Sequence, residues 1–292
     1  MKYLSKKDIR LPKRDPKSHK GDNGKVLVIG GSRDYVGAVA LAGLAALRSG
    51  ADWVTIAAPE KVGWQINALS PDLIVKKYRG DDFCASRAKD ILKLSQEFDA
   101  VLIGNGIGMH AKSFCRKFVS ECKKPMVIDA DGIKAIEIWG IDNSIITPHI
   151  RELEILLENS KIDKGIIKKI TNKKLPIEKR SLLIKKVLNN KKLKNKNVII
   201  LLKGPVDAII SKDKIKYNKT GNAGMTKGGT GDVLAGLCIG YLAQTKNLFQ
   251  SACIAAYING LIGDILLKKK KGFTYLASDM VEEIKKISLK TR

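Results

Sequence analysis

The chain has 292 residues, of which 44% are hydrophobic, and a formal net charge of +25. Together with a mean hydropathy of −0.10, this composition excludes a disordered chain, and the 26 glycines lack the three-residue period of collagen. The longest apolar stretch, 38–47, covers about ten residues, whereas a membrane-spanning helix needs about 20. No secretory signal is apparent at the start of the chain. We therefore expect a cytoplasmic protein with no membrane partner.

The positive charge is concentrated in two segments. Residues 158–197 contain 14 Lys or Arg against 3 Asp or Glu, and residues 1–25 contain 9 against 3. Most of these cations are lysines, and arginine, which reads bases through bidentate hydrogen bonds, is scarce. We interpret the basic N-terminal arm (1–24) and the lysine-rich insert (159–197) as solvated surface, and we expect no specific nucleic-acid partner. Weak nonspecific contact with polyanions is the alternative.

The cysteines show no metal-binding pattern. No C-x-x-C pair occurs, and the chain has only three histidines. We therefore expect no metal site built from protein ligands. In a reducing compartment we expect buried free thiols at all five cysteines, which are Cys84, Cys115, Cys122, Cys238 and Cys253.

Short apolar runs alternate with helical patterns along the whole chain. The expected strands are 25–29, 53–57, 100–103, 126–129, 145–147 and 198–202, with a hairpin at 208–217. The expected helices are 36–50, 111–123, 150–158, 232–243 and 248–268. This alternation predicts a single domain over 1–292, in which helices cover both faces of a doubly wound, mostly parallel sheet. The lysine-rich insert should be helical and exposed.

Glycine-rich or polar clusters follow five of the expected strands. They are Gly30-Gly-Ser32, Gly104-Asn-Gly-Ile-Gly108, Asp129-Ala-Asp-Gly132, Thr147-Pro-His149 and Lys203-Gly204. Ligands of open parallel sheets bind at the carboxyl ends of the strands, so these clusters predict a ligand site. A single histidine is often structural, but this position favours a substrate contact for His149.

The strongest signal is the segment Gly221-Asn-Ala-Gly-Met-Thr-Lys-Gly-Gly-Thr-Gly-Asp232. Three glycines in four positions, directly before a predicted helix, allow several backbone N–H groups to converge on one anion. Asp232 lies at this anion hole, where its carboxylate could accept a proton from an attacking hydroxyl. The alternative is that Asp232 only caps the helix. The chain has no Walker A motif and no complete dinucleotide fingerprint.

Taken in order, these motifs resemble those of the ribokinase-like superfamily and, within it, the NAD(P)H-hydrate dehydratases. The resemblance rests on Lys20 to Ser32, Tyr35-Val-Gly-Ala38, Asp129 to Gly132, Thr147 to His149 and Asn222 to Asp232. It extends from about residue 19 to residue 282, so it implies a ribokinase-like three-layer α/β/α fold for nearly the whole chain.

The resemblance also implies an activity. The family dehydrates NADHX and NADPHX, the hydrated forms of the nicotinamide cofactors, to NADH and NADPH, using ADP or ATP with Mg²⁺. Hydroxide leaves poorly, so the hydroxyl must first become a phosphate ester, and loss of phosphate then restores the cofactor. Asp232 would take the hydroxyl proton as the catalytic residue, while the amides of 228–231 would stabilise the transferring phosphoryl group.

Motif positions assign further residues. The substrate-binding residues would be Ala38, Gly106, Gly108, His149 and Asp232. The nucleotide-binding residues would be Lys203, Gly204, Pro205, Val206, Asp207, Gly228, Gly229, Thr230 and Gly231. Asn105 stands where the family often has proline, and Lys227 stands where a small or apolar residue is usual. This makes Lys227 a further candidate for a phosphate contact.

Two other functions remain open at this stage. A hydroxyethylthiazole or hydroxymethylpyrimidine kinase of the same superfamily would share the anion hole and the aspartate, and a nucleic-acid-binding protein would use the insert. For the dehydratase, the resemblance favours ADP over ATP as the donor and implies a homo-oligomer, often a tetramer. The family's companion epimerase is often fused at the N-terminus. The first motif here begins at Lys20, so we expect the epimerase on a separate chain.

Overall fold

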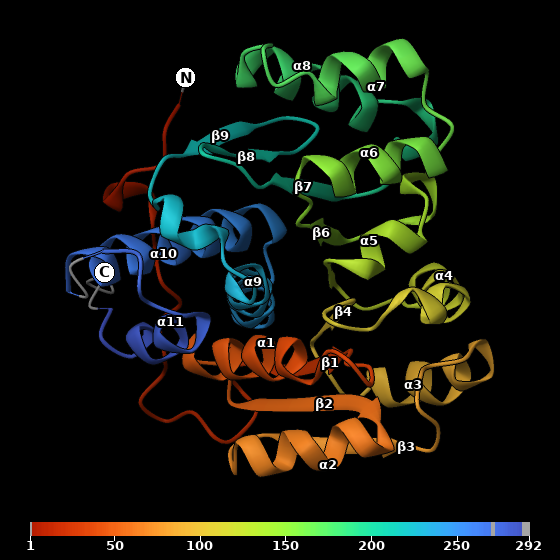
Figure 1. Ribbon diagram of the computed structural model, residues 1–292, viewed down its shortest axis with the longest axis vertical. Helices are drawn as coiled ribbons and strands as arrows, with labels where there is room; N and C mark the ends of the chain where they lie inside the picture. The colour runs from red at the N-terminus through yellow and green to blue at the C-terminus, as the bar shows by residue number, and fades with distance from the viewer. Residues whose placement is uncertain (1, 270–271, 288–292) are drawn as a thin grey trace.

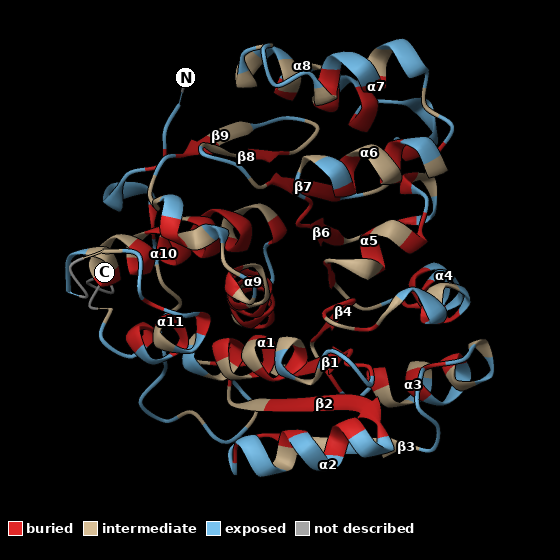
Figure 2. Ribbon diagram, viewed as in Figure 1, coloured by how far each residue is buried: buried red, intermediate tan, exposed pale blue. Residues whose placement is uncertain are grey.

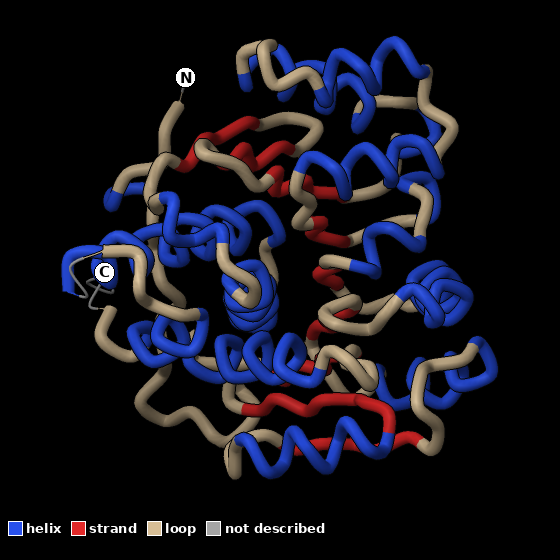
Figure 3. The backbone as a smooth tube through the Cα atoms, in the orientation of Figure 1, coloured by secondary structure: helices blue, strands red, loops and turns tan. Residues whose placement is uncertain are grey.

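The computed structural model describes residues 2–269 and 272–287. Within this part of the chain nine strands form one sheet, in the order β3-β2-β1-β4-β5-β6-β7-β8-β9. Figure 3 shows them as a continuous column. The strands are β1 (Lys25–Ile29), β2 (Trp53–Pro59), β3 (Ile74–Tyr78), β4 (Ala100–Ile103), β5 (Met126–Ile128), β6 (Ser144–Ile146), β7 (Val198–Leu202), β8 (Asp207–Ile210) and β9 (Ile215–Asn218).

The sheet is parallel from β3 to β7, and β8 and β9 extend it as an antiparallel hairpin. The chain winds outward from β1 in one direction through β2 and β3, and then continues on the other side of β1 with β4. The boundary between β1 and β4 is therefore the topological switch point, where open α/β sheets bind their ligands.

Helices cover both faces of the sheet, as predicted (Figure 1). One face carries α1 (Val36–Arg48), α2 (Glu60–Leu69), α9 (Thr230–Thr245), α10 (Leu248–Lys269) and α11 (Ala277–Ile284). The other carries α3 (Ala88–Ser95), α4 (Lys112–Glu121), α5 (Asp131–Ala135), α6 (Ile150–Asn159), α7 (Lys164–Thr171) and α8 (Ile177–Leu188). Short 3₁₀ helices lie at Lys6–Asp8, Ala85–Arg87, Met109–Ala111, Ile138–Gly140, Lys191–Leu193 and Ala223–Thr226. The three-layer α/β/α fold is confirmed.

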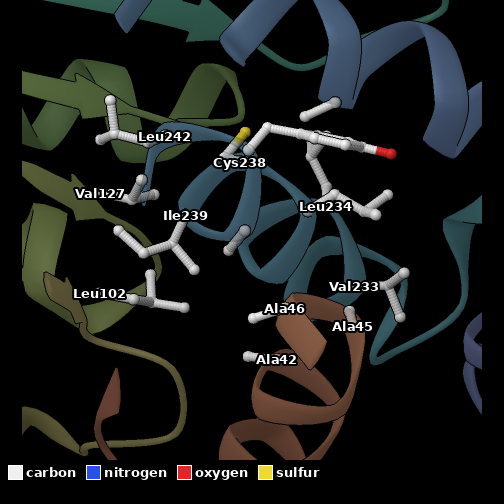
Figure 4. Packing of buried hydrophobic residues seen from close by; sticks show 14 of the residues in the cluster. Ala42, Ala45, Ala46, Leu102, Val127, Val233, Leu234, Cys238, Ile239 and Leu242 are labelled. Atoms are coloured by element: carbon white, nitrogen blue, oxygen red, sulfur yellow. The ribbon is translucent and has the colours of Figure 1, made fainter. Parts of the chain in front are cut away.

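Helix α9 is the most deeply enclosed of these elements (Figure 2). Its apolar side chains pack between the small residues of α1 and sheet residues such as Leu102 and Val127 (Figure 4). A Cβ atom at Gly236 would lie 2.2 Å from the carbonyl oxygen of Ala42, so only glycine allows this approach of α9 to α1. This packing fixes the N-terminus of α9 at the carboxyl edge of the sheet.

The lysine-rich insert is helical, as predicted, but it is not simply a solvated addition. Its helices α7 and α8 belong to the crossover between β6 and β7. One face of the insert is buried in the core beneath the sheet, through Ile167, Ile170, Ile184, Val187, Leu188 and Leu193. The expectation of an exposed segment was therefore wrong for this apolar face, which amphipathic helices bury while their lysines remain in solvent.

The N-terminal arm is also attached to the domain. Its expected short helix is the 3₁₀ turn Lys6–Asp8. Leu4 and Ile9 are buried in the core, and Tyr3 forms an isolated bridge with Tyr217 of β9. The apolar side chains of the arm therefore anchor it to the domain, while its basic side chains remain exposed.

Two expectations from composition need correction. All five cysteines are free thiols, as expected, but Cys84 is exposed, whereas the other four are buried. By length and composition alone, helix α10 is long and apolar enough to cross a membrane, although polar residues interrupt its sequence. Of its most apolar window, 67% is buried inside the protein, as expected for a core helix.

Candidate active site

A cavity of about 550 Å³ opens at the carboxyl edge of the sheet, beside the switch point between β1 and β4. Five of the predicted site residues line it, namely Ala38, Gly106, Gly228, Gly229 and Asp232. They come from three distant parts of the sequence, so the fold brings the predicted motifs together. Asp34, Tyr35, Asp131 and Lys134 also line the cavity.

The anion hole is built at the N-terminus of α9. Gly229 adopts φ 91°, a left-handed conformation that favours glycine, and the helix begins at the next residue. The backbone N–H groups of Gly228, Gly229, Gly231 and Asp232 make no hydrogen bond to another group in the described residues. Unpaired N–H groups and the positive end of the helix dipole face the same region, which suits a phosphoryl group.

Thr230 has a structural role in the glycine-rich loop. Its hydroxyl contacts the carbonyl oxygens of Met225 (2.7 Å) and Lys227 (2.9 Å). Its backbone N–H also donates to the carbonyl oxygen of Lys227, at 3.4 Å. A nucleotide contact of Thr230 stays a prediction.

Asp232 belongs to a buried polar network. The Nδ2 atom of Asn105 donates hydrogen bonds to Asp232 Oδ1 (2.7 Å) and to Asp129 Oδ2 (2.9 Å). Asp129 Oδ1 accepts from the hydroxyl of Thr147 (2.7 Å) and from the ammonium of Lys203 (3.0 Å). These side chains follow β4, β5, β6 and β7, so the network runs across the ends of four neighbouring strands.

The backbone at Gly104 makes this network compact. Gly104 adopts φ 123°, and a Cβ atom there would lie 2.0 Å from the carbonyl oxygen of Asp129. Any side chain at position 104 would therefore force the ends of β4 and β5 apart. Glycine at position 104 lets the ends of β4 and β5 approach closely, and this approach brings the Asn105 amide within reach of the Asp129 carboxylate.

The surroundings of Asp232 alter its acidity. Burial raises the pKa of its carboxyl to about 7, with the hydrogen bond from Asn105 and the charge of Lys203 opposing the increase. A carboxylate with a pKa near neutrality is a suitable general base at cellular pH. Asp232 does not accept a hydrogen bond from the N–H groups of its own helix, which argues against the capping interpretation.

Lys203 connects the carboxylates to the nucleotide side. Burial alone would lower its pKa, but the charges of Asp129 and Glu152, 3.0 and 3.6 Å from its ammonium, raise the pKa on balance. A Cβ atom at Gly231 would lie 3.6 Å from the same ammonium. The cation therefore lies next to the anion hole, where it can meet a phosphate.

The other residues predicted on the nucleotide side form a turn after β7. The N–H of Gly204 donates to Asp207 Oδ1 at 3.1 Å, and Asn218 donates to Asp207 Oδ2. Burial raises the pKa of Asp207 to about 6. Pro205 is exposed and Val206 half-buried, so this turn presents backbone at the edge of the site. A nucleotide contact here stays a prediction.

His149 and Gly108 do not line the cavity. The Nδ1 atom of His149 accepts hydrogen bonds from the N–H groups of Arg151 and Glu152, so the imidazole caps helix α6. Burial lowers the pKa of His149, which favours the neutral ring. The N–H of Gly108 donates to Asp131 Oδ2 at 3.2 Å. A substrate contact of His149 stays a prediction, and its structural role is the one that the geometry displays.

Lys227 has a structural role in this structure. Its ammonium donates hydrogen bonds to the carbonyl oxygens of Phe273 and Tyr275. The Tyr275 hydroxyl in turn donates to Asn222 at 2.8 Å. These contacts hold the glycine-rich loop against the segment before α11, and a phosphate contact of Lys227 stays a prediction.

The strand-end clusters in the sequence placed Asp129, Asp131 and Thr147 at the predicted ligand site but assigned them no individual role. Lys134 and Glu152 lie outside these clusters and were not predicted. Lys134 lies one turn into α5, where its ammonium contacts Asp131 at 2.7 Å. Glu152 lies in the first turn of α6, and no signal at the sequence level singled it out.

Comparison with known proteins shows the family of the chain. The family model for NAD(P)H-hydrate dehydratase matches residues 26–286. A bifunctional NAD(P)H-hydrate repair enzyme of Methanocaldococcus jannaschii is 42% identical over 279 residues, covering 94% of this chain and 50% of the relative. The chain thus spans about half the length of such bifunctional relatives.

Two further relatives match along nearly their whole length. The ADP-dependent (S)-NAD(P)H-hydrate dehydratase of Cenarchaeum symbiosum is 32% identical, with 96% of this chain and 94% of the relative covered. The solved structure of the Bacillus subtilis ADP/ATP-dependent NAD(P)H-hydrate dehydratase, co-crystallised with ATP and Mg²⁺, is 26% identical, with a TM-score of 0.75 and 98% of both chains covered. Since the family match includes the anion hole, Asp232 and the strand-end network, the chain belongs to the NAD(P)H-hydrate dehydratase family.

Proposed function

We propose that this protein dehydrates NADHX and NADPHX to NADH and NADPH, with ADP as the phosphoryl donor. The observation that carries the proposal is the position of Asp232, a carboxylate of pKa about 7 on a cavity that also contains an anion hole. A base and a phosphate site on one cavity fit the transfer of a phosphoryl group to a substrate hydroxyl.

The first step would phosphorylate the hydroxyl of the hydrated nicotinamide ring. Asp232 accepts the hydroxyl proton, and the hydroxyl oxygen forms a bond to the β-phosphorus of ADP. The bond from that phosphorus to its bridging oxygen breaks, and AMP leaves. The N–H groups at 228–231 and the Lys203 ammonium stabilise the charge on the transferring group.

The second step would expel the phosphate. The ring C–O bond breaks and phosphate leaves with the bonding electrons. The departing phosphate takes a proton from the adjacent ring carbon, and the C–H electrons form the dihydronicotinamide double bond. The overall change converts NADHX and ADP to NADH, AMP and phosphate. Phosphorylation makes this elimination feasible because phosphate is a far better leaving group than hydroxide.

Mg²⁺ would enter with the nucleotide. Among the described residues no group of three or more His, Cys, Asp or Glu side chains is arranged to hold a metal ion. A nucleotide-bound Mg²⁺ takes phosphate oxygens, water and one or two carboxylates, and Asp131 would supply such an oxygen on the cavity. The ion would neutralise phosphate charge during transfer.

The direct test is incubation of the protein with NADHX, Mg²⁺ and either ADP or ATP. We expect absorbance at 340 nm to recover and AMP and phosphate to appear in equal amounts when ADP is the donor. Activity with ATP only would reassign the donor. If neither nucleotide restores NADH, and hydroxyethylthiazole or hydroxymethylpyrimidine is phosphorylated instead, the protein is a kinase of the same superfamily.

The lysines of the insert should be dispensable for this reaction. None of the residues that line the cavity falls within 159–197. Replacing exposed lysines such as Lys173, Lys174 and Lys179 by glutamine should leave kcat within about threefold, because exposed charges this far from a site are screened by salt. Substitution is preferable to deletion, since the opposite face of the insert is in the core. A hundredfold loss in a folded variant would show that the site extends to the insert.

Three properties of the whole protein are part of the same proposal. We propose a homo-oligomer, in line with the family resemblance, a cytoplasmic location, and a dependence on an epimerase activity that this domain does not itself supply. Size-exclusion chromatography with light scattering tests the first. Supplying a mixture of the two NADHX epimers tests the last, because this domain alone should convert only one of them.

A further inference from the structure

Asn105 is the residue that joins the two buried aspartates of the site. It is fully buried in the turn after β4, and its Nδ2 atom donates to Asp232 Oδ1 at 2.7 Å and to Asp129 Oδ2 at 2.9 Å. One amide group thereby uses both of its donors on two carboxylates.

The orientation of this amide follows from its surroundings. A flipped amide would bring Asn105 Oδ1 against two carboxylate oxygens, which repel it. In the orientation observed, Oδ1 is buried and has no hydrogen-bond partner among the described residues. An unpaired buried carbonyl costs free energy. The position is therefore poorly explained by stability alone.

The backbone holds the amide in place. The carbonyl oxygen of Asn105 accepts a hydrogen bond from the N–H of Gly31 at 2.9 Å. A Cβ atom at Gly30 would lie 2.3 Å from the same oxygen, so the turn after β1 closes tightly on the turn after β4. Asn105 therefore presents its donors from a fixed backbone.

The two aspartates end up with unequal sets of partners. Both oxygens of Asp129 are bonded, Oδ1 to Thr147 and Lys203 and Oδ2 to Asn105. Asp232 accepts a single hydrogen bond from a described residue, at Oδ1, and it lines the cavity. Its Oδ2 atom is left to accept a proton from a bound hydroxyl.

We infer that Asn105 is a positioning residue that orients Asp232 and reserves Oδ2 of this carboxylate for the substrate proton. It acts through Asp232 and need not touch the substrate. The inference rests on the proposed function for the identity of the reaction, but the hydrogen bond and its effect on Asp232 exist independently of that reaction.

Removing the amide should make Asp232 less acidic. The hydrogen bond from Asn105 stabilises the charged carboxylate, so its loss raises the pKa of Asp232 further above about 7. The charges of Asp129 and Glu152 act in the same direction, while Lys203 opposes them. Each pKa unit makes the base tenfold scarcer at pH values below the midpoint.

The test compares Asn105→Leu, which keeps the side-chain volume but lacks donors, with the wild-type protein. Carbon-13 NMR of aspartate carboxyls, with Asp232→Asn identifying the resonance, measures the midpoint of Asp232 without any substrate. We expect this midpoint to rise by about one unit. In the NADHX assay kcat at pH 6.5 should fall about tenfold and recover towards pH 9, with KM for ADP within about threefold.

Two further variants complete the test. Asn105→Ala also removes both donors without adding a charge, and it should move the midpoint in the same direction if Asn105→Leu does not fold. Asn259→Leu is the matched control, because Asn259 of α10 also has a buried Oδ1 without a partner among the described residues. It should leave the midpoint of Asp232 unchanged.

An unchanged midpoint in folded Asn105 variants would overturn the inference, as would a loss of kcat equal at all pH values. Failure of the wild-type protein to restore NADH would instead overturn the proposed function. The NMR titration would still decide whether Asn105 controls Asp232. The two failures are therefore distinguishable.

Discussion

Asp232→Asn is expected to lower kcat by about 10² to 10⁴, the usual loss on removal of a general base. The amide has the size of the carboxylate, and its Oδ1 can still accept the hydrogen bond from Asn105 Nδ2. It cannot take a proton from the substrate at neutral pH. ADP affinity should be unchanged or slightly higher, because the backbone N–H groups at 228–231 remain and a nearby negative charge is gone. Calorimetry with ADP and turnover of NADHX on one sample separate the two effects.

Stability provides an independent control for this variant. The pKa of Asp232 is raised from 3.8 to about 7, so the folded protein binds this proton more tightly than the unfolded chain. The ionised carboxylate therefore destabilises the fold increasingly as pH rises from about 4 to 7, and the full cost persists above 7. Asp232→Asn should unfold at a higher temperature than wild type at pH 8, with the difference vanishing near pH 4. Near-normal kcat in the variant would mean that the base lies elsewhere.

The elements of the fold that could be predicted from the sequence are those whose side chains are all buried to a similar degree. β1, β4 and β7 are buried on both faces, and their continuous apolar runs identified them within a residue. β3 was missed because it is an edge strand, Ile74-Val-Lys-Lys-Tyr78, with its side chains partly in solvent. A half-exposed edge strand has no continuous apolar run in its sequence. The pairing of β3 with β2 therefore depends on the tertiary structure and not on a local pattern.

Several short helices were missed for a related reason. α5 has five residues and α3 has eight, too few for a periodic pattern to be distinguished from a loop. α5 begins directly after Asp129-Ala130, where Ala130 adopts φ 50°. That conformation is rare outside glycine, so nothing in the sequence indicates it. It nevertheless places Asp131 and Lys134 on the cavity.

The part of the candidate site that is formed by backbone N–H groups could be predicted from the sequence. The part that is formed by contacts between side chains could not. The glycines at 228, 229 and 231 indicate an anion hole, because few other structural roles require three glycines so close together. The bridge from Asn105 to two aspartates depends on the relative positions of β4, β5 and α9, which no local pattern encodes. The same holds for His149, whose strand-end position predicts a ligand contact while its Nδ1 atom caps α6.

Lys203→Met is expected to produce the largest loss of stability among substitutions in the site. The lysine ammonium contacts Asp129 and Glu152, whose side chains are only 3% and 6% exposed. Methionine keeps the length of the side chain and removes the charge, so two buried carboxylates lose their cation. Breaking a buried pair in this way typically costs about 3–5 kcal/mol, because an uncompensated charge remains. The 20% exposure of the Lys203 side chain favours the lower end of that range.

The pH dependence and a matched variant make this prediction specific. Without Lys203 the charge of the Asp232 carboxylate is less well compensated, so the variant should be closest to wild type near pH 4 and should lose stability as pH increases. In a plot of kcat against pH, the rise that reflects ionisation of Asp232 should also move to higher pH. The reason is that the charge of Lys203 helps to keep the Asp232 carboxylate ionised. Lys216→Met breaks a pair of similar length, 2.8 Å to Asp8, whose side chains are about one-third exposed, and should cost about 1 kcal/mol or less. Urea denaturation at pH 8 measures the unfolding free energies of both variants. If the two values are equal, the contacts of Lys203 are as solvated as those of Lys216. The strand-end network would then not depend on the charge of Lys203.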